Sequence, residues 1–60
     1  MNTTEYLHDA AEALDRAMLD LMKAYYYASE SDDSTKQSRI SDMIGQCSEL
    51  KELSSYEANR

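Results

Sequence analysis

Few residues in this 60-residue sequence could break a helix, form a disulfide or bind a metal. There is no proline, one glycine, one cysteine and one histidine. A single cysteine excludes a disulfide within the chain, and a single histidine leaves little for zinc. A chain this short buries only roughly 60% of the surface that its unfolded form exposes. Self-association is therefore the expected source of added stability.

Basic charge and long apolar runs are also scarce. Six Lys and Arg against twelve Asp and Glu give a net charge of −6, and the basic residues are spread along the chain. This balance repels a phosphate backbone, so direct nucleic-acid binding is not expected. No apolar run approaches the ~20 residues of a transmembrane helix, and the N-terminus lacks the features of a signal peptide. We expect a soluble, cytoplasmic protein that binds no membrane, with its thiol in a reducing compartment.

The composition predicts helix almost throughout, because proline and strand-like alternation are absent. Asn2 can cap a first helix over residues 3–28, with Glu5 completing a capping box and Met1 packing on Tyr6.

The short polar residues of 29–34 predict the only turn. Ser34 with Gln37 forms a second capping box, which starts a helix over residues 35–56. The prediction is an all-α, antiparallel two-helix hairpin in a single domain, residues 1–60, that dimerises into a four-helix bundle.

A seven-residue repeat of apolar side chains runs through the first helix. Large residues at Leu7, Leu14 and Leu21 alternate with small ones at 10, 17 and 24. This pattern predicts close packing against another helix. The predicted core of the hairpin and dimer is Leu7, Ala10, Leu14, Ala17, Met18, Leu21, Ala24, Tyr25, Ile40, Met43, Cys47 and Leu50.

The apolar arc widens in the second half of this helix. Leu19, Met22 and Tyr26 add a stripe that broadens the arc to roughly 200°, more than one neighbouring helix covers. A second hairpin could pack there, or the stripe, with Tyr27, could form a docking patch for a foreign protein, and both could hold at different edges of the arc. Arg39 is a candidate polar anchor across the turn. Tyrosine suits such a surface, because it combines a large area with a polar tip.

The alternation Leu7/Ala10, Leu14/Ala17 and Leu21/Ala24 resembles the alanine-rich hairpins of the plasmid copy-control Rop family. That resemblance implies a dimeric four-helix bundle. It covers the layout only, since no RNA-contacting motif aligns. In size, acidity and lack of chemical motifs the chain also resembles small phage-encoded proteins that disable a host protein by docking on it.

Side chains that could perform chemistry do not form a catalytic arrangement. Glu5, His8 and Glu12 have the spacing of a helical metal motif but lie away from the predicted core, and Cys47 occupies a core position of the second helix. No nucleophile, base and orienting group can be assembled. We therefore expect a protein that is not an enzyme and has no cofactor or metal.

The functional hypothesis is a non-enzymatic inhibitor or anti-activator of phage or plasmid type. It would dock on a bacterial transcription regulator, nuclease or other enzyme and block its normal partner. Two alternatives remain open. Glu30, Asp32 and Asp33 could belong to an acidic nucleic-acid mimic of the anti-CRISPR kind, or the chain could be a Rop-like RNA-binding dimer.

Gly45 is either tolerated in its helix or marks the close approach of another backbone.

Overall fold

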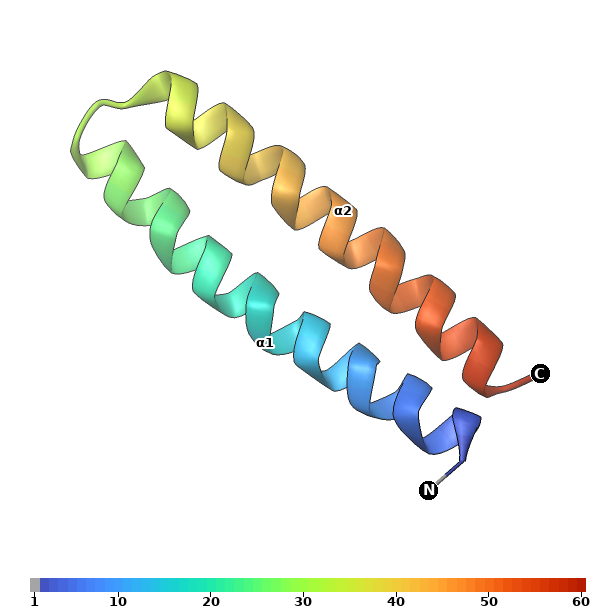
Figure 1. Cartoon of the computed structure of the whole chain (residues 1–60). Helices are drawn as coiled ribbons and strands as arrows, with labels where there is room; N and C mark the ends of the chain where they lie inside the picture. Colours follow the sequence, from blue (N-terminus) through green and yellow to red (C-terminus); the bar gives the residue numbers. More distant parts are fainter. Residues whose placement is uncertain (1) are drawn as a thin grey trace.

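The chain is a two-helix hairpin in the computed structural model, which describes residues 2–60. Helix α1 spans Thr3–Glu30 and helix α2 spans Ser34–Ala58. The two helices run antiparallel, so both termini lie at the same end (Figure 1). The prediction of an all-helical hairpin is confirmed. The predicted packing of Met1 on Tyr6 lies outside the described residues.

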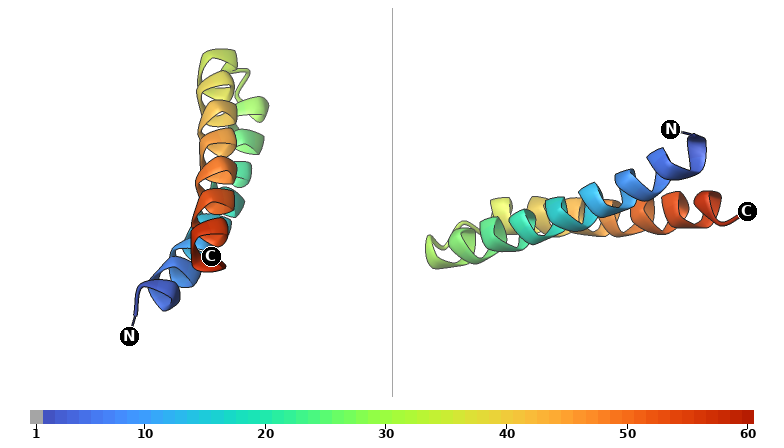
Figure 2. Two further views of the ribbon diagram at one scale, coloured as in Figure 1. Left: turned by 90° about the vertical axis from the view of Figure 1, so that its right-hand side faces the viewer. Right: turned by 90° about the horizontal axis from the view of Figure 1, so that it is seen from below.

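The hairpin is long and thin. Its Cα atoms extend over 44 × 15 × 10 Å with a radius of gyration of 13.9 Å, whereas a compact chain of this length has a radius near ~10 Å. The helices cross at a shallow angle, so that the first turns of α1 lie off the line of α2 (Figure 2). Each helix therefore has one side against its neighbour and the rest of its circumference open.

Both helices begin at a side-chain cap. Asn2 Oδ1 accepts a hydrogen bond from the Glu5 amide at 2.9 Å, as predicted. The predicted cap at Ser34 is wrong: Asp33 caps α2, and its Oδ1 accepts from the Lys36 amide at 3.1 Å. Asp and Ser are equally good caps, and here Ser34 is already the first helical residue.

The reversal between the helices takes three residues, because α1 ends in a Schellman motif. The Asp33 amide donates to the Ala28 carbonyl and the Asp32 amide to the Ser29 carbonyl. Asp32 has a φ of 54°, the left-handed conformation that usually requires glycine at this position. Helix α1 consequently extends two residues beyond the predicted end.

The contact between the helices is narrow. Among residues 2–60 the buried apolar side chains are Ala11, Ala28, Ile40 and Ala58, of which only Ile40 is large. Half-buried side chains extend this line on both helices: Leu7, Leu14, Met18, Leu21, Ile44, Cys47 and Lys51. The hairpin has a core one side chain thick, which is little for a folded domain.

Two polar contacts fix the register of the helices, one near the termini and one near the middle of α1. Ser54 Oγ donates to the Leu7 carbonyl at 2.7 Å. Lys51 Nζ lies 2.7 Å from Asp15 Oδ1 in a partly exposed ion pair. The sum of the two residue numbers differs slightly between these contacts, and its mean is about 63. A residue of α1 is therefore level with the residue of α2 whose number brings the sum to about 63.

Candidate functional site

Exposed apolar side chains are the candidate functional feature of this hairpin. Ten large ones are at least two-fifths exposed: Tyr6, Leu19, Met22, Tyr25, Tyr26, Tyr27, Met43, Leu50, Leu53 and Tyr56. Single exposed apolar residues are ordinary, whereas contiguous groups mark contact surfaces. Five of the ten belong to two groups on different sides of the hairpin.

The first group, named the docking patch here, is Leu19, Met22 and Tyr26 of α1. Their spacing of three and four residues puts them on one side of the helix. They are 60%, 54% and 58% exposed. Leu19 and Met22 border a shallow hollow together with Asp15 and Met18.

The second group, named the alanine face here, combines Ala10, Ala17 and Ala24 of α1 with Met43 and Leu50 of α2. The alanines recur every seven residues, so they form one stripe along α1. Ala24 and Met43 border the same groove of about 570 Å³, which places both stripes on one side of the hairpin. Met43 is 44% and Leu50 53% exposed.

The two groups lie on different sides of α1. Five residues separate Ala17 from Met22, which is a rotation of roughly 140° around the helix. The hairpin contact occupies the narrow sector between them, where Met18 and Leu21 are half-buried. Two different molecules could therefore occupy the docking patch and the alanine face at the same time.

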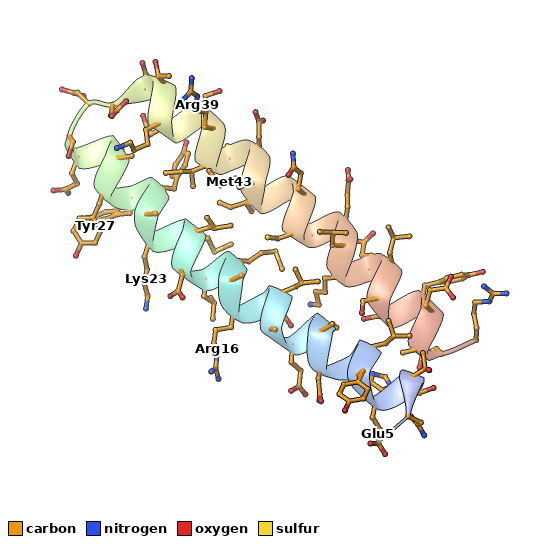
Figure 3. The ribbon with its side chains drawn as sticks, viewed as in Figure 1. Glu5, Arg16, Lys23, Tyr27, Arg39 and Met43 are labelled. Atoms are coloured by element: carbon orange, nitrogen blue, oxygen red, sulfur yellow. The ribbon has the colours of Figure 1, made fainter. Side chains whose placement is uncertain are left out.

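The structure separates two of the predicted partner-binding residues from the docking patch. Tyr27 borders a hollow with Ala24 and Lys36, and Arg39 borders the groove of the alanine face. Figure 3 shows Tyr27 on the side of α1 away from α2. The Tyr27 ring packs edge-on against Tyr26, with centroids 5.6 Å apart. Tyr27 thus lies on the outer side of α1, opposite the hairpin contact and between the outer edges of the two groups.

Several predicted core residues are not covered within one hairpin. Ala10, Ala24, Tyr25, Met43 and Leu50 are exposed. The residues of α1 that are covered wholly or in part are Leu7, Ala11, Leu14, Ala17, Met18, Leu21 and Ala28, and those of α2 include Ile40, Ile44 and Cys47. The alanine stripe flanks this contact line.

The ionisable groups considered in the sequence have structural or solvent-exposed positions. Glu5, His8 and Glu12 are all exposed on α1. Asp33 is half-buried as the cap of α2, whereas Glu30 and Asp32 are exposed at the turn. Cys47 is half-buried in the contact between the helices. Only Glu30 and Asp32 of the predicted acidic cluster thus remain open to a partner.

Sequence reasoning missed the polar part of the helix contact. Lys51 and Ser54 occupy inward positions of α2, at the spacing that continues from Ile44 and Cys47. Their helical spacing could have identified them as inward residues. They were missed because the core was predicted from apolar residues only, and lysine and serine are polar.

The described residues, 2–60, include no helix that is both long and apolar enough to cross a membrane. Comparison of the chain with protein-family models, with curated proteins and with solved structures finds no match.

Proposed function

We propose that this chain is a non-enzymatic inhibitor or anti-activator, which docks on a bacterial regulator or enzyme and blocks that protein's normal partner. The observation that carries the proposal is the docking patch, where Leu19, Met22 and Tyr26 lie side by side and more than half exposed. Such contiguous apolar side chains on a small surface are typical of protein contact sites.

The patch has the chemistry and rigidity of a protein-binding surface. Its side chains project from the second half of a 28-residue helix, so little conformational entropy is lost when a partner covers them. Tyr26 contributes a large ring with a polar tip, which suits the wet rim of an interface. Asp15 borders the hollow of the patch, and Lys23 lies four residues after Leu19 and three before Tyr26, so both are polar residues at its rim.

Small residues of α2 lie level with the patch along the hairpin. By the register of the hairpin, Met22 is level with Ser41 and Leu19 with Gly45. A Cβ atom added at Gly45 would meet nothing within 4 Å. A partner helix could therefore lie along α2 and reach the apolar side chains from the side. A hairpin of this size acts on its partner by covering the surface where it binds.

The proposed form of the protein in the cytoplasm is a homodimer, a four-helix bundle of two hairpins. One hairpin buries Ile40 as its only large side chain among the described residues. A second copy would cover apolar surface that one hairpin leaves open and so add the missing stability.

The test is capture from a bacterial lysate with quantitative mass spectrometry, using the wild-type chain, L19E, Y26A and the control Y56A. Tyr56 is 64% exposed at the far end of α2, so Y56A makes the same change as Y26A away from the patch. We expect a protein that wild type and Y56A retain and that L19E and Y26A release, with unchanged helical circular dichroism.

Two other results would contradict docking through the patch. Capture that survives L19E but is lost on neutralising Glu30 and Asp32 would indicate an acidic mimic. Asp33 is left unchanged in that variant because it caps α2. Direct RNA binding with a steep salt dependence would indicate a Rop-like activity.

A further inference from the structure

The alanine face is the broad apolar side of the hairpin that the docking patch does not use. Both of its stripes follow a seven-residue repeat. From Ala10 to Ala24 in α1 and from Met43 to Leu50 in α2, none of the residues at this repeat is charged. Charged residues continue the α2 stripe only at its two ends, with Lys36 seven residues before Met43 and Glu57 seven residues after Leu50.

The surface of the hairpin is large enough to support a stable dimer. The chain exposes 4730 Å², about 700 Å² more than a compact protein of 6.9 kDa. A face 44 Å long and 15 Å wide offers about 660 Å², near the 800 Å² that each partner contributes to a standard interface. Covering one broad face would thus bring the exposed surface to an ordinary value.

The two stripes of the alanine face share one centre. Ala17 is the middle of the α1 stripe, and the midpoint of Met43 and Leu50 is the middle of the α2 stripe. The register set by the Ser54 and Lys51 contacts puts these two centres level with each other. A surface with this property can be matched to itself by a twofold axis.

We propose that the alanine face binds a second copy of this chain head to tail, with the turn of each hairpin against the open end of the other. The twofold axis lies in the plane between the two faces, at right angles to the helices and level with Ala17. Helix α1 therefore packs on α1 of the second copy, and α2 on α2. This proposal deepens the proposed function, and it rests on the homodimer proposed there.

In this arrangement each repeating position of the two stripes meets a suitable counterpart. Ala10 meets Ala24 and Ala17 meets itself, so the two α1 helices approach closely. On the other side Met43 meets Leu50. At both ends Lys36 meets Glu57 of the second copy, which gives two opposite-charge contacts at the rim.

The charges distinguish this arrangement from the one with both turns at the same end. There α2 would lie on α1 of the second copy, and Lys36 would face Ala24 and Tyr27, which offer no carboxylate. Lys36 forms no ion pair within residues 2–60, and Glu57 has only the exposed terminal Arg60 at 3.2 Å. Both groups are exposed and available to a second copy.

The dimer leaves the docking patch uncovered, because the patch lies on the opposite side of the hairpin contact from the alanine stripe. The assembly then presents two identical patches. A target protein would not compete with dimer formation.

The decisive experiment is a charge-exchange cycle read by sedimentation equilibrium, with the variants K36E, E57K and K36E/E57K. Positions 36 and 57 are about 30 Å apart along one helix, so they cannot interact within a chain. We expect each single change to weaken the dimer by about tenfold and the double change to restore it to within about threefold. K36E/E49K is the control, since Glu49 is exposed but lies outside the stripe; it should stay as weak as K36E.

A second pair of variants tests the face itself. Ala24 and Ser41 are both exposed helical residues, but Ser41 is two residues from Met43, a rotation of roughly 200° that puts it on the other side of α2 from the alanine face. We expect A24E to dissociate the dimer and S41E to leave it intact, with helical circular dichroism confirming that both variants fold.

Each remaining outcome overturns the inference. A wild-type chain that stays single excludes the second copy as occupant. A dimer without coupling between positions 36 and 57 has a different orientation, and one that survives A24E uses a different face. Failure of the proposed function is seen separately in the capture assay, where a head-to-tail dimer that retains no protein contradicts the docking patch alone.

Discussion

Ile40→Ala should remove a large part of the stability of a single hairpin. Ile40 is 6% exposed and is the one large buried side chain among the described residues. Truncation to alanine deletes its side-chain carbons beyond Cβ, at ~0.8 kcal/mol of transfer free energy for each. The cost of such a change is 2–5 kcal/mol in general, depending on the cavity that is left.

The position of Ile40 decides where in that range the change falls. Ile40 borders the groove of the alanine face, so in a single hairpin the vacated space opens to water and the cavity contributes little. We therefore expect a loss of about 2–3 kcal/mol. A 60-residue domain has ~3–9 kcal/mol in total. The loss would rise toward the upper end of the range if a second copy closes the groove.

Urea unfolding followed by circular dichroism at 222 nm measures this loss, with Leu53→Ala as the control. Leu53 is 60% exposed, so its truncation should cost less than 1 kcal/mol. If I40A unfolded at the wild-type urea midpoint, or cost no more than L53A, Ile40 would not be the centre of the helix contact.

Three further changes test the local structure of the helices by the same unfolding measurement. Asp33→Ala should lower the free energy of unfolding by about 1 kcal/mol and Ser34→Ala by much less, because Asp33 is the cap; equal losses would contradict this. Gly45→Ala should raise it by about 1 kcal/mol, since the added Cβ meets open space, and a decrease would mean that another backbone lies there. Asp32→Gly should also raise it by about 1 kcal/mol by relieving a φ of 54°, and an unchanged midpoint would refute that account.

The hairpin itself could be predicted from the sequence because its signals are local. A chain without proline, with one cluster of short polar residues, can only form two helices around one turn. The exact turn could not be predicted. Asp33 and Ser34 are adjacent and equally good caps, and the choice between them depends on the Schellman motif that Asp32 completes without glycine.

The side of α1 that meets α2 was harder to predict, because the apolar residues of α1 support two overlapping contact lines. Leu7, Leu14 and Leu21 belong to both. The line through Ala11 and Met18 faces α2, whereas the line through the alanines at 10, 17 and 24 stays at its edge. The periodicity of α1 predicts both lines. Which of them packs against the neighbouring helix depends on the side chains of α2, which the sequence of α1 does not contain.

The candidate site was predictable in part for the same reason. Leu19, Met22 and Tyr26 follow from spacing within one helix. Arg39 does not, since its position relative to α1 depends on the length of the turn, and the structure puts it beside the alanine face.

Sedimentation equilibrium of the wild-type chain at several concentrations tests the central claim most directly, namely that one hairpin leaves apolar surface that a second copy covers. We predict a species of about 13.8 kDa, twice the 6.9 kDa of one chain, that dissociates on dilution and melts at a higher temperature as the concentration rises. A single 6.9 kDa species at all concentrations up to about 100 μM, with cooperative melting independent of concentration, would contradict it.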